Sequence, residues 1–454
     1  MDIVSRRKTL KQVLKTSIPA VIDLSSQTIT WLIETIMIGQ ISVAAIGSVG
    51  LCHQIILLTF TVLLTFIVGS SIIVTRYLGV GDTWNANHIL GQSLFIGFIF
   101  SIIIGLIWYF GAPLLFSLIR EEEPIARQYG IQYITTIALF TPLIVTNFMA
   151  LGILRGAGDT LVTMKINLIV NILYLLLDAI LIFGLLGFPR LETLGAGLAG
   201  GIAHSTGCIL TLIVLRSRKA SLFLAVMEIT RPKLETFKRL IKIGVPTTVE
   251  QLVWSLGQLV MSIYAGWIGV VVLATHQVFV RIQAVITMVF FGFSLGSMTL
   301  VGKNLGAELK RQARRTGRVT GLLGLIAGLC IALLFYLGSE HILSIFTSDS
   351  SVINQGKSLI LIFALLQLPK GANIVYSGSL RGSADLNWLM WLAVVTAIGY
   401  EIIGSWVLAI PLGFGLKGLW LIQGIDETTR LSLNYWRFNR GKWFKFDIMN
   451  KQNK

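Results

Sequence analysis

Charged side chains are scarce in this chain of 454 residues, where Asp, Glu, Lys and Arg together make up 13% of the sequence. That is about half the fraction found in typical soluble domains. Hydrophobic residues make up 54%, and the mean hydropathy is +0.80. The composition excludes an ordinary soluble domain and predicts a polytopic membrane protein. The formal net charge is +16, but with so few charges we expect no nucleic-acid partner.

Cysteine and histidine are also rare, with three and five residues. Cys52, Cys208 and Cys330 all lie in hydrophobic stretches, and their odd number implies no disulfide framework. The five histidines show no metal-ligand spacing, so we interpret them as incidental. The sequence therefore predicts neither a metal centre nor a cofactor.

Two stretches match enzyme motifs by letter alone. The segment 354–358 contains Gly-Lys-Ser, but Ser351 stands where a phosphate loop needs its first glycine. The segment 292–296 reads G-x-S-x-G inside a hydrophobic helix, whereas a nucleophile elbow requires a strand-to-helix turn. The nearest histidine, His276, is 18 residues from Ser294 (294 − 276). Small residues for helix packing explain this segment better, and an intramembrane enzyme is the least favoured function.

Hydrophobic stretches long enough to cross a bilayer, which takes about 20 helical residues, recur along the whole chain. We expect twelve spans, at 16–39, 46–75, 89–118, 130–154, 162–187, 193–215, 240–267, 271–301, 317–338, 356–380, 388–412 and 415–436. The chain begins with a basic segment followed at once by the first span, which is too long and too polar for a signal peptide. We interpret it as a retained helix.

Basic residues gather on one side of these spans. They precede the first span, follow the last, and fill the loops between spans 6 and 7 and between spans 8 and 9. The loops on the opposite side hold the acids Glu121, Glu122, Glu123, Glu340 and Asp349 and little basic charge. The positive-inside rule therefore places both termini in the cytoplasm, with the protein in the cell membrane.

The chain repeats itself at an offset of about 227 residues. Pro19 aligns with Pro246 (246 − 19), and Asp23 aligns with Glu250 (250 − 23). At an offset of 226, GILRGAGD at 152–159 aligns with GSLRGSAD at 378–385. Two halves of six spans share one topology, because six is even, and are related by a pseudo-two-fold axis along the membrane normal.

The predicted fold is therefore an all-α polytopic membrane protein with twelve transmembrane helices in two six-helix lobes. We place the N-lobe at 1–225 and the C-lobe at 226–454, joined by a basic cytoplasmic linker around 216–242.

Ionisable residues within the spans are the candidates for function, since each costs a few kcal/mol or more in hydrocarbon. They are Asp23, Glu34, Asp178, Glu250, Arg281, Lys370, Glu401 and Asp426. A carboxyl group in an apolar cavity can bind and release a proton near neutral pH, because burial favours its protonated form. The alternative role is an ion pair that fixes helix packing.

Two sites fit the pairing role. Asp426 lies four residues before Arg430, a spacing that brings the two together on one helix face. Lys370 and Glu401 carry opposite charges on neighbouring spans and are expected to neutralise each other, with Glu250 as the competing partner for Lys370.

Seven motifs in order resemble the multidrug and toxic compound extrusion (MATE) family. They are IETIMIG at 33–39, Leu78-Gly79, LRGAGDT at 154–160, LLLDAILIFG at 175–184, ATHQVFVRIQ at 274–283, LRGSAD at 380–385 and a closing segment with Asp426, Arg430 and Lys442-Trp443. The resemblance implies cation-coupled export of amphipathic, often cationic, organic compounds. It also implies two lobes that rock around a central cavity, and no enzymatic activity.

The resemblance implies roles for individual residues. Glu34 stands where the family usually has an aspartate in the first span, and Asp178 matches its fifth-span aspartate, so these two residues are expected to form the N-lobe cation site. Tyr174 stands where many members have an asparagine, and Gly201 where a threonine is common. Both changes remove oxygen ligands that a sodium ion would want, so we expect proton coupling, with Na⁺ left open.

The C-lobe departs further from one subfamily of the MATE family. Glu250 matches the seventh-span acid of that subfamily, but Lys370 stands where it has an aspartate. A lysine cannot ligate Na⁺, which disfavours a C-lobe sodium site. This lysine resembles the DinF-like branch.

The predicted function is a secondary antiporter, in which protonation of Glu34 and Asp178 alternates with substrate occupancy. We expect a monomer surrounded by membrane lipids. Further candidates for the substrate cavity are Asn171, Tyr174, Glu250, Lys370, Glu401 and Asp23. A flippase for lipid-linked glycans is the alternative within transport, and a basic cavity or extra spans would favour it.

The two acids of the first span differ in their repeat partners. Asp23 aligns with another acid, Glu250, and so suits a role shared by both lobes. Glu34 aligns with Met261 (261 − 34). The acid without an acidic counterpart is the better candidate for the proton.

Overall fold

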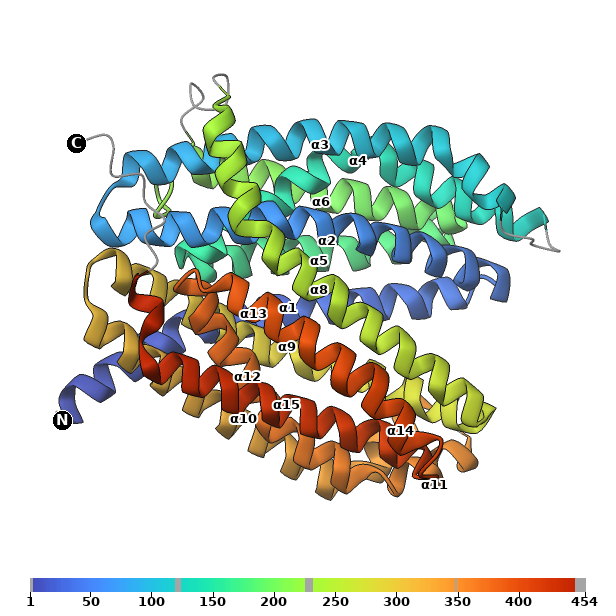
Figure 1. The fold of residues 1–454 in the computed structure, drawn as a ribbon. Helices are drawn as coiled ribbons and strands as arrows, with labels where there is room; N and C mark the ends of the chain where they lie inside the picture. The colour runs from blue at the N-terminus through green and yellow to red at the C-terminus, as the bar shows by residue number, and fades with distance from the viewer. Residues whose placement is uncertain (1–2, 119–123, 225–231, 348, 446–454) are drawn as a thin grey trace. The chain divides into compact units, whose positions relative to one another are not determined.

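The computed structural model describes residues 3–118, 124–224, 232–347 and 349–445 (Figure 1). Nearly all of these residues are helical, and none of them belongs to a strand. The predicted acidic loop residues Glu121, Glu122 and Glu123, and residues 225–231 of the predicted linker, lie outside the described residues.

Most of the helices follow one another along the chain with short connections (Figure 1). In order they are α1 (Ile3–Gly39), α2 (Val43–Val80), α3 (Thr83–Leu118), α4 (Pro124–Ala157), α5 (Thr160–Phe183), η1 (Leu185–Gly187), α6 (Glu192–Arg216), α8 (Leu234–Ile268), α9 (Val270–Gly306), α10 (Lys310–Phe346), α11 (Ser350–Lys357), α12 (Ile360–Gly382), α13 (Leu386–Thr396), η2 (Ala397–Gly404), α14 (Ser405–Ala409), α15 (Gly415–Arg440) and η3 (Lys442–Lys445).

Each predicted span coincides with a long helical segment. In the described part of the chain, nine of these segments are long and apolar enough to cross a membrane. The others, α1, α8 and α15, carry the charged residues that made their spans functional candidates. The eleventh span is built from α13, η2 and α14, where η2 is a π-helical turn that contains Glu401. Such turns occur often at functional sites.

Two predicted span limits are wrong for local reasons. The fifth span was expected to reach residue 187, but α5 ends at Phe183 because Gly184 takes a left-handed conformation (φ 72°) that stops the helix. The tenth span was expected to begin at 356, but it begins at Ile360. Residues 350–357 form the separate helix α11, whose sequence SSVINQGK is too polar to continue a membrane span.

The contacts divide the chain into two units, residues 22–244 and residues 1–21 with 245–454. The chain passes from one unit to the other inside α1 and again inside α8, close to the repeat-related Pro19 and Pro246. The predicted boundary between 225 and 226 lies upstream of the change in α8, so the first turns of α8 belong by contacts to the preceding unit.

A single helix lies at the centre of each unit. In residues 22–244, α4 packs against α2, α3 and α6, and α5 packs against α6. In residues 245–454, α12 packs against α9, α10 and α15. α4 and α12 carry the repeat-related LRGAGD and LRGSAD segments at their ends. The arginines of these segments, Arg155 and Arg381, therefore lie on the central helix of each unit.

Candidate functional site

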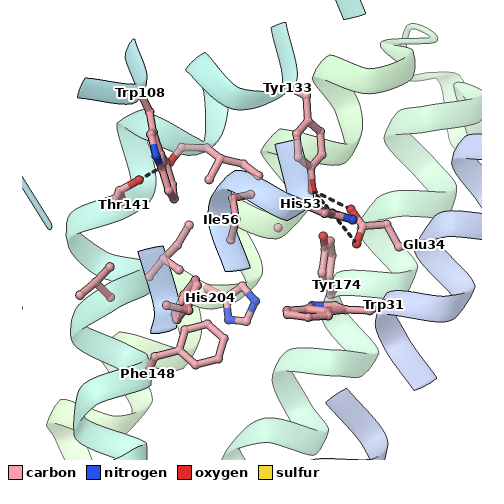
Figure 2. A pocket seen from close by; sticks show the side chains of 15 residues that line it. Trp31, Glu34, His53, Ile56, Trp108, Tyr133, Thr141, Phe148, Tyr174 and His204 are labelled. Carbon is pink, nitrogen blue, oxygen red and sulfur yellow. Dashed lines mark hydrogen bonds and ion pairs between the residues drawn. The ribbon is translucent and has the colours of Figure 1, made fainter. Parts of the chain in front are cut away.

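A cavity opens within the unit of residues 22–244, among α1 to α6 (Figure 2). It holds about 630 Å³ of unoccupied space, part of it open to solvent. Its lining is mostly apolar and aromatic, and the lining residues are Trp31, Glu34, His53, Ile56, Phe60, Trp108, Tyr133, Ile137, Thr141, Ile144, Val145, Phe148, Tyr174, Gly200 and His204. Among these described lining residues Glu34 is the one carboxylate. Such a lining suits an amphipathic molecule with a cationic group.

Glu34 is fully buried and is held by two side chains (Figure 2). The Tyr133 hydroxyl donates a 3.0 Å hydrogen bond to Glu34 Oε1, and His53 Nε2 lies 3.7 Å from Glu34 Oε2. His53 Nε2 also lies 2.9 Å from the Tyr133 hydroxyl, and its ring stacks on Trp31. The His53 side chain is 31% exposed, so it connects the buried carboxyl group to the open part of the cavity.

Histidine was interpreted as incidental in the sequence, and that interpretation is wrong for His53 and His204, which both line the cavity. The His204 ring packs against Phe148 and Tyr174 (Figure 2). No sequence signal could have linked His53 to Glu34, because they lie on different helices and the packing of α2 on α4 decides which face of α2 turns to the cavity.

Asp178 on α5 is also fully buried, and neither of its carboxylate oxygens has a hydrogen-bond partner among the described residues. Its charge interacts with that of Glu34. Two ionised carboxyl groups close together in an apolar environment would be costly. The described residues contain no cluster of three or more His, Cys, Asp or Glu that could hold a metal ion.

The other two candidates on α5 lie in different surroundings. Tyr174 lines the cavity and is 4% exposed. Asn171 is not among the lining residues and instead donates a 2.9 Å hydrogen bond to the Ser26 hydroxyl on α1. The structure therefore brings Tyr174 together with Glu34 and leaves Asn171 in a helix-packing contact.

Asp23 is engaged by polar partners and is not among the cavity-lining residues. Its carboxylate accepts hydrogen bonds from Asn167 (2.5 Å) and Gln27 (3.1 Å), and Arg155 lies 3.8 Å away. Glu250, its repeat partner, forms a 2.7 Å ion pair with Arg381 in the other unit. Arg155 and Arg381 come from the two aligned LRG segments (381 − 155 = 226).

Lys370 pairs with neither of its two predicted partners. Its ammonium group lies 3.5 Å from Glu427 Oε1, and both side chains are buried. The reason is helix packing: α12 lies against α15, which carries Glu427. Glu427 also accepts a 2.7 Å hydrogen bond from Asn373. Glu427 was absent from the sequence-based candidates, and its position next to Asp426 was the one available signal.

Glu401 and Asp426 complete this charged cluster. The predicted pair of Asp426 with Arg430 is present at 3.1 Å. Glu401 is 1% exposed, and its charge interacts with Arg430, Asp426, Glu427 and Lys370. At the 227 offset Glu401 corresponds to Tyr174 (401 − 174), and Glu427 to Gly200 (427 − 200). Charged residues in this half thus replace the lining of the other half's cavity.

Comparison with known proteins gives the same architecture. The family model MatE matches residues 19–180 and again residues 246–407. The two matches are offset by 227 residues (246 − 19), which is the internal repeat seen in the sequence. Together they cover more than half of the chain.

Relatives match over nearly their whole length. The uncharacterized transporter YisQ of Bacillus subtilis is 27% identical over 91% of this chain and 90% of its own. A protein of Thermotoga maritima named Probable multidrug resistance protein NorM is 26% identical, over 97% and 95% of the two chains.

Solved structures confirm the predicted all-α, twelve-span, two-lobe fold. The Vibrio cholerae MATE transporter VcmN superposes with a TM-score of 0.89 at 17% identity, covering 97% of this chain and 99% of that one. A MOP superfamily transporter from Pyrococcus furiosus gives 0.87 at 19% identity, covering 97% of each chain. The chain is therefore a multi-pass membrane transporter, not an enzyme, and it belongs to the MatE family.

Proposed function

We propose that this transporter is a secondary antiporter that exports amphipathic, cationic organic compounds in exchange for protons. The observation that carries the proposal is the burial of two carboxyl groups: Glu34, which lines the aromatic cavity, and Asp178, whose charge interacts with that of Glu34. When both are ionised, the cavity favours an organic cation. When protons occupy them, that attraction is lost and the substrate is released. The name of the Thermotoga maritima relative supports a multidrug substrate range.

The surroundings of the two carboxyl groups favour H⁺ over Na⁺. Glu34 receives the Tyr133 hydroxyl and the His53 imidazole and also interacts with Tyr174, whereas Asp178 receives no hydrogen bond from the described residues. Gly201 offers no side-chain oxygen and lies close to the Phe140 ring. A hard cation needs several oxygen ligands, whereas a proton needs one carboxylate oxygen. Lys370, neutralised by Glu427, supports placement in the DinF-like branch.

In this proposal both termini are cytoplasmic, the protein acts as a monomer in the cell membrane, and the lobes 1–225 and 226–454 alternate access to the cavity. The basic loops support the orientation. A lipid-linked glycan flippase would need a basic cavity, and the described lining contains neither lysine nor arginine.

The test is efflux of a cationic dye from proteoliposomes under a pH gradient alone and under a sodium gradient alone. The wild type is expected to respond to the pH gradient, and Glu34→Gln and Asp178→Asn are expected to abolish that response while keeping the folded yield. Glu340→Gln is the control, because that carboxylate is 70% exposed in a surface pair with Lys357. Full coupling in both cavity variants, or coupling to sodium alone, would overturn the mechanism.

A further inference from the structure

A basic groove lies at the start of α10, in the unit that contains residues 245–454. Its described lining consists of Lys310, Arg311, Arg314, Arg315, Arg318, Val319, Leu322 and Phe444, without an acidic residue. It holds about 1050 Å³ of unoccupied space, part of it open to solvent. The groove shares no lining residue with the cavity around Glu34.

The cations of the groove lie close together at the positive end of a helix. All five cations fall within the first three turns of α10, and the first turn holds no acidic residue. The N-terminal end of a helix is the positive end of its dipole, so cations there are destabilised. Residues 311, 314, 315 and 318 also share one helix face, where like charges repel. A bound anion would relieve both effects.

Two of the arginines are already positioned around the groove. The Arg314 guanidinium lies 5.1 Å from the centre of the Phe444 ring, and its buried Nε has no hydrogen-bond partner among the described residues. Arg318 donates two hydrogen bonds to Asn439 Oδ1, at 3.1 and 2.8 Å. Guanidinium groups held in this way are suited to a phosphate, which they can bind through paired hydrogen bonds.

The groove lies at one end of a membrane-spanning stretch of α10. After Arg318 the next charged residue of α10 is Glu340, and the uncharged stretch between them is about 20 residues, the length that spans hydrocarbon. Below the cations a row of apolar side chains is exposed on the same side of α10: Leu322, Ile326, Leu329 and Leu333. The cations form a basic rim above this row of apolar side chains. Together the rim and the row match a phospholipid with a negatively charged headgroup.

We propose that this groove binds an anionic phospholipid, with its phosphate against Arg311, Arg314 and Arg318 and its acyl chains along Leu322 and Ile326. A free phosphate would use the rim alone and leave the apolar row without a partner. The orientation proposed above places the groove in the cytoplasmic leaflet, but the binding itself does not depend on that orientation.

The test uses the full-length protein purified in detergent and measures its thermal unfolding with added phosphatidylglycerol or phosphatidylcholine. Phosphatidylglycerol is expected to raise the Tm of the wild type, and phosphatidylcholine is not. For the exposed pair Lys310→Gln/Arg311→Gln, the phosphatidylglycerol concentration for half of the effect should rise about fivefold per charge removed. Arg314→Gln is expected to weaken the effect similarly.

The matched control is Arg216→Gln/Lys219→Gln, which removes two exposed cations, one at the last residue of α6 and one three residues beyond it. It is expected to respond like the wild type. Leu322→Ser should weaken the response to the lipid and leave any response to inorganic phosphate unchanged. An unaltered response of Lys310→Gln/Arg311→Gln, or an equal loss in the control, would overturn the groove as the site. Equal stabilisation by inorganic phosphate would overturn the lipid as the ligand.

Discussion

The Glu250 carboxylate accepts a 2.7 Å charge-assisted hydrogen bond from Arg381, and the repeat-related Asp23 and Arg155 form a longer ion pair in the other half, at 3.8 Å. Each acid stands four residues after a repeat-related proline, and each arginine belongs to an aligned LRG segment. The pairs join α8 to α12 and α1 to α4. Duplication in both halves indicates a structural role for these charges.

Arg381→Gln is expected to lower the stability by about 2–3 kcal/mol, because it leaves the Glu250 carboxylate, 15% exposed, without its partner. Thermal unfolding in detergent measures the loss, and Glu250→Gln/Arg381→Gln should recover part of it. Glu250→Gln alone should retain proton-driven efflux. A loss of coupling in Glu250→Gln as severe as that in Glu34→Gln would contradict the structural role.

Tyr133→Phe removes the hydroxyl that donates to Glu34. A hydrogen bond to a charged group contributes about 1.5–3 kcal/mol, so we expect at least a tenfold loss in proton-driven efflux at limiting substrate. Tyr129→Phe is the matched control: that tyrosine lies one turn away on α4 and donates to Glu192. Proton-driven dye efflux from proteoliposomes is measured for both variants. An equal loss of efflux in Tyr129→Phe would contradict a specific role of Tyr133 in coupling.

Gly257 on α8 leaves room for the Glu401 carboxylate, because a Cβ atom there would lie 1.6 Å from Glu401 Oε2. Gly257→Ala should therefore destabilise the protein by about 1–3 kcal/mol, as overpacking does. Gly266→Ala on the same helix would meet its nearest atom at 3.7 Å and should be neutral or slightly stabilising. Thermal unfolding measures the stability of both variants. A higher Tm for Gly257→Ala would contradict the close packing of Gly257 against Glu401.

Lys370→Met leaves Glu427 as an uncompensated buried charge and should cost about 3–5 kcal/mol. The double variant Lys370→Met/Glu427→Gln should regain much of this loss. Lys357→Met, in the exposed pair with Glu340, should change the Tm little. A Tm of Lys370→Met equal to that of the wild type would show that the ion pair with Glu427 does not stabilise the fold.

Much of the architecture could be predicted because it depends on local composition. Hydrophobic length located all twelve spans, and the aligned prolines and LRG segments revealed the two halves. The errors were local as well. Gly184 ends α5 early through its left-handed backbone, and the polar segment 350–357 separates as its own helix.

The site was predictable only in part. Glu34 and Asp178 were identified because a carboxyl group is conspicuous in a hydrophobic span, and Asp426 because its partner lies one turn away. Tyr133 and His53 were missed because they lie on other helices, and tyrosine and histidine are unremarkable in a membrane span. The partner of Lys370 was mistaken because Glu427 lies on α15, 57 residues further along the chain (427 − 370).

The sequence by itself determined how often the chain crosses the membrane, that it is duplicated, and that several acids lie within its spans, since hydropathy and internal repeats are properties of the linear chain. Tertiary structure alone decided which of those acids are neutralised and which stay available. Helix rotation and packing place three charged pairs together: Asp23 with Arg155, Glu250 with Arg381 and Lys370 with Glu427. The same packing leaves Glu34 and Asp178 without a strong base among the described residues. Partner choice depends on distances of a few ångströms across helices far apart in the chain, which no local pattern encodes.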